Sequence, residues 1–169
     1  MKIDLKKLNT SAHASIPFDE TIDLTDEKLY GAKPFQSPVH IKGVVSNESG
    51  VGRLVGSIET IYSTECARCL KPLEIPLSAE ADMMLSDDPE AEEEDDLFVL
   101  TSDSVDPADV LVPALILQVQ MTYLCKEDCK GLCPHCGADR NVTDCDCDKK
   151  QIDPRFAALR ALLDSDKGE

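Results

Sequence analysis

The chain has 169 residues, of which 42% are hydrophobic, and this is enough for one ordinary domain with a small appendage. No apolar run reaches the ~20 residues that span a bilayer, and the first residues lack the apolar core of a signal peptide. We therefore expect a cytoplasmic protein without a membrane partner. Thiols stay reduced in that compartment, so the eight cysteines favour metal binding over disulfides.

The formal net charge of −16 is concentrated in one segment. Residues 87–109 contain eleven carboxylates and no lysine or arginine, whereas the rest of the chain has 22 acidic and 17 basic residues. The densest part, 86–96, repels itself, so we expect a solvated acidic loop. Binding phosphates requires a basic surface. The charge thus disfavours direct contact with RNA and favours a basic partner protein.

The first two thirds of the chain are expected to form mainly antiparallel strands, because most apolar residues there alternate with polar ones. The stretches with a strand pattern are 1–8, 15–18, 21–24, 39–45, 53–63, 73–85 and 97–100. A turn cluster rich in glycine, 47–52, separates two of these stretches. That arrangement predicts a β-hairpin.

Cys66 and Cys69 form a CxxC on the tight turn expected between two strands. A zinc knuckle needs this context. An unliganded pair at a hairpin tip is the alternative, although exposed thiols without a role are a redox liability. A thioredoxin-like motif is disfavoured, because its CxxC should open a helix and Pro72 follows here.

A helix over about 107–120 is predicted by Asp106 and Pro107, a capping carboxylate followed by a proline in the first turn. The helix is apolar nearly all round, so we expect it to be buried. Pro113 should kink it, or else mark a start closer to Asp109. Residues 119–124 alternate and are expected to be extended.

A second helix start, Asp153-Pro154, predicts a short amphipathic helix at the C-terminus, with Phe156, Leu159 and Leu163 on one stripe. The expected fold class is α+β, with an antiparallel β-rich core and a buried helix. The expected organisation is a core over 1–121, a cysteine-rich zinc-binding module over 122–150 and the C-terminal helix over 151–169.

All eight cysteines are candidate metal ligands, because close pairs on tight turns suit tetrahedral thiolate coordination of zinc. They are Cys66, Cys69, Cys125, Cys129, Cys133, Cys136, Cys145 and Cys147. We predict two zinc ions. One would be held by the first four cysteines, across a gap of 55 residues, and the other by the last four. A single site made of the four cysteines within 125–136 is the alternative, and an iron–sulfur cluster is a less favoured occupant.

The sites are expected to be structural, because no ligand position is left open for water. His135 lies inside the last CxxC turn, where it should face solvent. No nucleophile–base pair and no glycine-rich phosphate loop stands out. We therefore expect neither an enzyme nor a small-molecule substrate.

Several motifs together resemble the YceD family. They are Glu65-Cys66-Ala67-Arg68-Cys69-Leu70-Lys71-Pro72, the acidic loop, the Asp-led apolar helix, Cys129-Lys130-Gly131-Leu132-Cys133-Pro134-His135-Cys136-Gly137 with Asn141 and Cys145-Asp146-Cys147, and the closing Asp153-Pro154-Arg155 with its leucine-rich helix. The resemblance implies a role in accumulation of large-subunit ribosomal RNA, and hence in ribosome biogenesis in bacteria and plastids.

The favoured hypothesis is a zinc-stabilised factor that supports accumulation and processing of 23S rRNA as a binding or adaptor protein. Its expected partner is a ribosomal protein or the pre-ribosomal large subunit, with rRNA reached indirectly. A cytosolic thiol-redox or metal-handling protein is the alternative. A metalloenzyme is the third hypothesis, and it would require an open coordination position.

Overall fold

The computed structural model describes residues 2–10, 14–48, 50–88 and 96–147. Seven strands, one 3₁₀ helix and one α-helix are assigned in this part of the chain. In chain order they are β1 (Ile3–Asp4), η1 (Leu5–Thr10), β2 (Ser15–Ile22), β3 (Val39–Glu48), β4 (Val51–Glu65), β5 (Pro72–Ser86), β6 (Leu97–Val99), β7 (Ser104–Val105) and α1 (Pro107–Leu117). The expected α+β class is confirmed.

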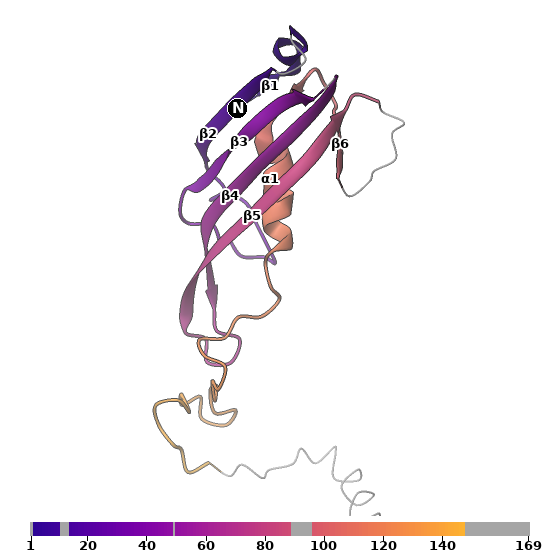
Figure 1. Cartoon of the computed structure of the whole chain (residues 1–169). Helices are drawn as coiled ribbons and strands as arrows, with labels where there is room; N and C mark the ends of the chain where they lie inside the picture. The colour runs from indigo at the N-terminus through magenta and orange to yellow at the C-terminus, as the bar shows by residue number, and fades with distance from the viewer. Residues whose placement is uncertain (1, 11–13, 49, 89–95, 148–169) are drawn as a thin grey trace, which may run out of the picture.

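A five-stranded sheet in the order β2-β3-β4-β5-β6 forms the body of the molecule (Figure 1). Its first four strands are antiparallel, as expected from the alternating pattern. The short β6 instead runs parallel to β5, from which residues 87–96 separate it along the chain. β1 and β7 pair separately with each other. The sheet is therefore mixed, with one parallel pair at its edge.

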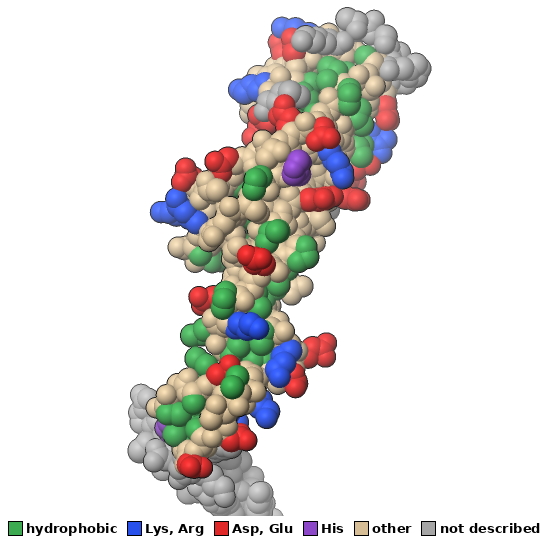
Figure 2. Space-filling model, turned by 90° about the vertical axis from the view of Figure 1, so that its left-hand side faces the viewer, with side chains coloured by type: hydrophobic (Ala, Val, Ile, Leu, Met, Phe, Trp, Pro, Cys, Tyr) green, Lys and Arg blue, Asp and Glu red, His purple; other side chains and the backbone are tan. Residues whose placement is uncertain are grey.

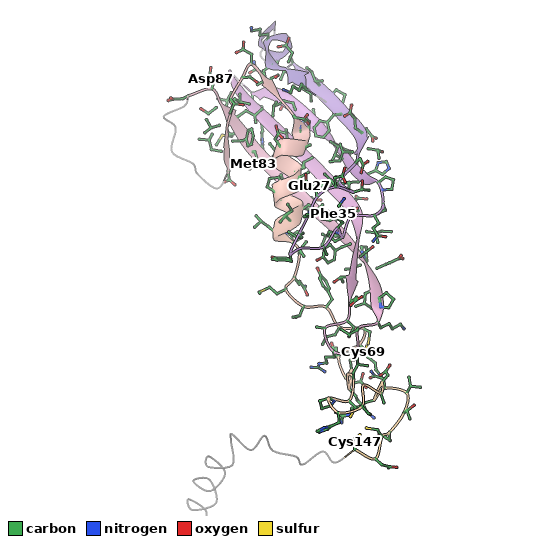
Figure 3. All side chains as sticks on the ribbon, turned by 180° about the vertical axis from the view of Figure 1, so that it is seen from behind. Glu27, Phe35, Cys69, Met83, Asp87 and Cys147 are labelled. Atoms are coloured by element: carbon green, nitrogen blue, oxygen red, sulfur yellow. The ribbon has the colours of Figure 1, made fainter. Side chains whose placement is uncertain are left out.

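The helix α1 packs on one face of this sheet, against β3, β4 and β5 (Figures 1 and 3). Leu111 and Leu115 are fully buried there, together with Leu54 and Ile58 of β4. The burial expected for the helix is found on this side only, since Leu117 is 83% exposed. No helix in the described ranges is long and apolar enough to cross a membrane. Figure 1 looks onto the opposite face of the sheet, on which the described residues place no helix.

Two glycines that face each other across β3 and β4 let the core close tightly. Gly43 pairs with Gly56, and the Phe18 ring of β2 lies over both of them. A Cβ atom on Gly43 would lie 2.3 Å from the Val55 carbonyl oxygen and 2.6 Å from Phe18 Cζ. No side chain fits at this position, so the glycine is required by packing.

Two strand predictions need correction. The strand expected over 1–8 ends at Asp4, because the Asp4 carboxylate accepts a hydrogen bond from the Lys6 N–H at 2.9 Å and η1 begins at Leu5. The turn expected over 47–52 is tighter, since Glu48 already pairs with Val51. By contrast, the two stretches expected within 15–24 join into the single strand β2.

The helix prediction holds at its start and is wrong at its end. The Asp106 carboxylate caps α1 by accepting the Ala108 N–H at 3.1 Å. The helix runs uninterrupted through Pro113, whose position faces solvent, and ends at Leu117 rather than near 120. Residues 119–124, expected to be extended, form no strand; Tyr123 packs against Tyr62 instead. Most of the acidic loop, residues 89–95, and the helix predicted over 151–169 lie outside the described residues.

Candidate metal centre

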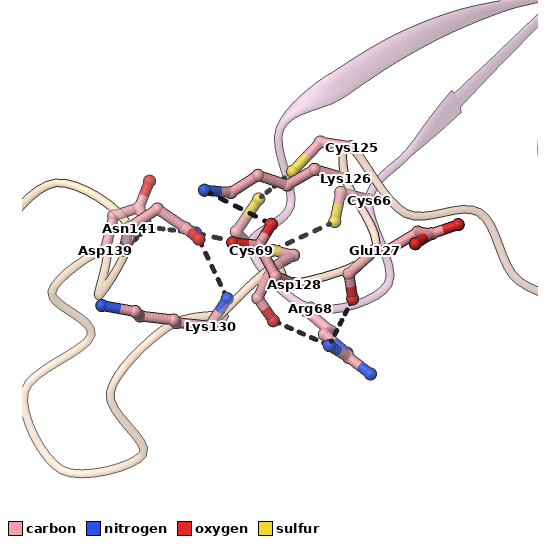
Figure 4. Close-up of polar contacts among 11 residues, drawn as sticks. Cys66, Arg68, Cys69, Cys125, Lys126, Glu127, Asp128, Lys130, Asp139 and Asn141 are labelled. Carbon is pink, nitrogen blue, oxygen red and sulfur yellow. Dashed lines mark hydrogen bonds and ion pairs between the residues drawn. The ribbon is translucent and has the colours of Figure 1, made fainter.

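Four cysteines from two distant parts of the chain meet at one end of the sheet (Figures 3 and 4). These are Cys66 and Cys69, on the turn between β4 and β5, with Cys125 and Cys129, from the segment after α1. Their Sγ atoms all lie within 4.8 Å of one another. We call them the inner cluster. Three of its members are buried, and Leu73 and Leu132 pack beside them.

The spacing of the sulfur atoms fits tetrahedral coordination. Cys66 Sγ lies 3.8 Å from Cys129 Sγ, and Cys69 Sγ lies 3.6 Å from Cys125 Sγ. A metal–sulfur distance of about 2.3 Å gives tetrahedral edges of about 3.8 Å. A disulfide would need the sulfurs at about 2.05 Å. The geometry suits a metal site better than it suits bonded pairs.

The remaining four cysteines form a second, outer cluster, made of Cys133, Cys136, Cys145 and Cys147, again with all Sγ atoms within 4.8 Å. It differs from the inner cluster in exposure. Cys133 is buried, Cys136 is exposed, and the other two are half-buried. Both clusters can hold a metal ion, but solvent reaches the outer one more easily.

The two CxxC turns share one backbone plan. The Leu70 N–H donates to the Cys66 carbonyl at 2.9 Å, and the Gly137 N–H donates to the Cys133 carbonyl at the same distance. In both turns the amide of the first cysteine donates at 2.8 Å to the carbonyl five residues on. Gly137 adopts a φ of 73°, which glycine tolerates, whereas Leu70 is held at 59°. The inner turn therefore carries left-handed backbone strain that the outer turn avoids.

Backbone amides prepare one sulfur in each cluster for binding. Burial disfavours the Cys66 thiolate, but hydrogen bonds from the backbone N–H groups of Cys125, Arg68 and Cys69 outweigh burial and lower the pKa of Cys66 to about 6. The backbone amides of Cys136 and His135 likewise lower the pKa of the Cys133 thiol to about 6. Burial, and then hydrogen bonding to the neighbouring Cys129, raise the pKa of Cys125 to about 12. Each cluster thus holds one readily ionised thiol, and in the inner cluster a bound cation would favour ionisation of Cys125 beside it.

Arg68 ties the inner CxxC turn to the chain that leads to the outer one (Figure 4). Its Nη1 donates to the Cys129 carbonyl at 2.8 Å, and its own carbonyl accepts the Leu132 N–H at 3.0 Å. Gly131 permits this approach, because a Cβ there would lie 2.9 Å from the Arg68 carbonyl oxygen and its φ is 70°. Direct hydrogen bonds therefore join the inner turn to the segment that leads to the outer cluster.

Asn141, which lies in the chain between Cys136 and Cys145, contacts a sulfur of the inner cluster. Its Nδ2 donates to Cys129 Sγ at 3.5 Å and to Asp139 Oδ1 at 2.7 Å, while its Oδ1 accepts the Lys130 N–H at 2.9 Å. The backbone and side-chain N–H groups of Asn141 lower the pKa of Asp139. Residues of this kind, which fix a ligand without touching the metal, orient the sulfur atoms of a site.

A family model described as large ribosomal RNA subunit accumulation protein YceD matches residues 54–163, which include every cysteine of both clusters. The chain belongs to the YceD family. No solved structure matches this YceD-family chain.

Curated relatives of the chain occur in bacteria and plants. An uncharacterized protein, YlbN of Bacillus subtilis, is 28% identical over 169 residues, covering 98% of each chain. An uncharacterized protein of Mycobacterium bovis is 30% identical over 65% of this chain and 55% of its own. The chloroplastic YCED homolog 1 of Zea mays, named a large ribosomal RNA subunit accumulation protein, is 26% identical over 72% of this chain and 52% of its own.

The structure brings the cysteines of this YceD-family chain together in the two groups predicted from their spacing. Their role as metal ligands stays a prediction. His135 is exposed, as expected for a residue inside the turn, and His40 is exposed on β3. Sequence reasoning assigned no role to Arg68. A basic residue inside a CxxC, where carbonyls crowd around the turn, is the signal that would have indicated it.

Proposed function

We propose that this protein is a zinc-stabilised assembly factor that supports accumulation and processing of 23S ribosomal RNA. Membership of the YceD family and the name of the plant relatives support the link to ribosomal RNA. The observation that supports the zinc-stabilised architecture is the pair of four-thiolate clusters at the end of the sheet. Together they favour a binding protein over a catalyst.

Zinc is the proposed occupant of both clusters because the donors are all thiolates at tetrahedral spacing. When bound, zinc supplies a fixed cross-link between chain segments. Cys66 and Cys133, whose pKa values are about 6, are the first thiolates available to it. Four sulfurs complete a tetrahedron, so no coordination position remains for substrate or water. This supports a structural role and a protein that is not an enzyme.

The partner is proposed to be a basic ribosomal protein or a protein component of the pre-ribosomal large subunit. The formal charge is −16, and each zinc with four thiolates would add a further charge of −2. Figure 2 shows carboxylates along the visible side of the molecule, with Lys and Arg scattered among them. Such a surface repels phosphates and attracts basic proteins. Any effect on rRNA would then be reached through a protein.

The proposal is tested by the ratio of large- to small-subunit rRNA in the natural host. Deletion of the gene should lower this ratio, and the wild-type gene supplied in trans should restore it. A gene with both Cys69→Ser and Cys125→Ser should restore it less well, because the inner cluster would be lost. An unchanged ratio in the deletion strain would remove the link to ribosomal RNA.

A thiol-redox or metal-handling function is the second candidate, and the exposure of Cys136 in the outer cluster is the observation that favours it. A structural protein should contain two zinc ions that resist a mild oxidant, whereas a redox or metal-handling protein should release zinc under the same treatment. Elemental analysis before and after oxidation separates the two functions. Purified protein without metal would contradict both zinc sites.

A further inference from the structure

The face of the sheet opposite α1 carries exposed apolar side chains. Four of the exposed large hydrophobic residues lie on it: Val51, Val55, Ile61 and Met84, which are 38–46% exposed. The strand register places them on one side, because Arg53 pairs with Met84 and Leu54, between Arg53 and Val55, is fully buried on the α1 side. An apolar set on an uncovered sheet face is typical of an interaction surface.

One part of this face is hollowed. Six residues line a hollow of about 420 Å³ at the end of the sheet where β6 joins β5: Glu48, Val51, Arg53, Asp82, Met84 and Asp96. The backbone fixes its wall, since the Met84 N–H donates to the Asp96 carbonyl at 2.8 Å. This end lies away from the cysteines, as the positions of Asp87, Cys69 and Cys147 in Figure 3 show.

The chemistry of the hollow selects one kind of occupant. Val51 and Met84 are each 46% exposed and provide apolar contact, while three carboxylates stand around them. Among the described residues, Arg53 is the one cation that lines the hollow, and it is already engaged: it bonds both oxygens of Asp82 at 2.7 Å and lies 3.2 Å from Glu48. Arg53 also holds the position between the carboxylates that a metal ion would need. The hollow therefore suits a cation with an aliphatic stem.

Lysine and arginine side chains have this character, an apolar stem with a charged head. The acidic segment 87–96 follows β5 directly, and its last residue, Asp96, lines the hollow. The eight carboxylates of this segment add to the negative charge that attracts a cationic partner. A second copy of this chain is disfavoured because it carries the same charge, and RNA is disfavoured for the same reason.

We propose that this hollow is the docking site for an arginine- and lysine-rich segment of a partner protein. The apolar stems pack on Val51 and Met84, and the charged heads pair with Glu48 and Asp96 on the rim. The inference rests on the proposed function for the identity of the partner, but the site itself is defined by geometry and charge alone. It adds a binding surface at the end of the sheet that holds no metal cluster.

The test uses the full-length metal-loaded protein and a fluorescein-labelled peptide of twelve alternating arginine and alanine residues, read by fluorescence anisotropy at low and moderate salt. Met84→Lys should weaken binding about tenfold, because it removes apolar contact and adds a like charge. Ile61→Lys is the matched control, since Ile61 lies on the same face outside the hollow, is 43% exposed and gives the same charge change. It should change binding by less than about twofold.

Arg53→Gln provides a second, opposite test. It frees Glu48 and Asp82 from an exposed ion pair whose loss the fold should tolerate. Peptide binding should tighten about threefold or more, because Asp82 becomes available to the peptide and Glu48 no longer shares its charge with Arg53. Backbone amide shifts on titration should centre on Val51 and Met84.

Equal weakening by Met84→Lys and Ile61→Lys would overturn the proposal, since the peptide would then sense only the overall charge. Amide shifts elsewhere, or the same shifts produced by an RNA oligonucleotide, would also overturn it. The proposed function fails separately, if deletion leaves the rRNA ratio unchanged while the peptide still binds. A Met84→Lys gene that fully restores the rRNA ratio despite lost peptide binding would show that the hollow is not the partner site.

Discussion

Removing one ligand of the inner cluster should unfold more of the molecule than removing one ligand of the outer cluster. Cys69→Ser disrupts a cross-link between the turn after β4 and the segment after α1, which are separated by 55 residues. Cys136→Ser disrupts a cross-link within a short segment, where only eight residues separate Cys136 from Cys145. The two variants remove the same chemical group.

The expected difference follows from loop closure. A cross-link that closes the longer loop reduces the entropy of the unfolded chain, which stabilises the fold by about 4 kcal/mol. For the shorter loop the same effect is about 2.5 kcal/mol. The longer loop contains β5 and α1, so its loss lowers the stability of the whole sheet. For a chain of this size 1 kcal/mol changes Tm by about 2–4 °C. Cys69→Ser should therefore lower the main Tm by roughly 8–16 °C.

The assay combines elemental analysis with thermal unfolding followed by circular dichroism. Each variant should lose one of two zinc ions, and Cys136→Ser should leave the main Tm within about 2 °C of the wild type, because the outer cluster lies beyond the sheet. A Cys69→Ser protein that keeps both metals and its Tm would refute the inner cross-link. Equal losses of Tm in both variants would refute the loop argument.

Two further predictions concern single residues. Gly137→Ala should weaken zinc binding at the outer cluster about 5–30-fold in chelator competition, because an alanine at a φ of 73° carries left-handed strain of about 1–2 kcal/mol. Gly131→Ala should weaken zinc binding more, since its Cβ would also meet the Arg68 carbonyl. Equal effects of the two variants would contradict this. Hydrogen bonding to Arg53 lowers the pKa of Asp82 below its ordinary value of 3.8. The pair therefore stabilises the fold above that pH, and this stabilisation is lost as the pH falls through the lowered pKa. Arg53→Gln should return the pKa towards 3.8 in an NMR titration, and an unchanged pKa would show that another group is responsible.

The grouping of the cysteines could be predicted because each short pair needs a second pair to complete four ligands. Cys66 and Cys69 had no local complement, whereas Cys133 and Cys136 had one close by. The hairpin and the capped start of α1 could be predicted for a similar reason, since both depend on local residue order. These are features in which spacing along the chain sets spacing in the fold.

Other features depend on contacts between distant segments, which one sequence does not reveal. The strand over 1–8 was wrong because the Asp4 side chain starts a helical turn that the apolar alternation conceals. The parallel direction of β6 is seen only in its pairing with β5, because three residues carry no signal of strand direction. The positive φ of Leu70 and the hydrogen bond from Arg68 to Cys129 arise only when the two cysteine segments meet.

The inner cluster explains how the far end of the sheet can be stable. β3 pairs with β4 only as far as Glu59, so from there to Glu65 the strand is paired with β5 and makes one isolated bridge, Phe35 with Tyr62. A two-stranded ribbon is marginally stable in water, and this one belongs to a chain whose charge of −16 opposes compaction. Burial of Tyr62 against Phe35 and Tyr123 supports its middle. At the tip, Leu73 and Leu132 are the partly buried leucines that pack against the cysteines among the described residues, so a metal bound by the CxxC and by the segment after α1 would supply a cross-link that the hydrophobic core does not provide there.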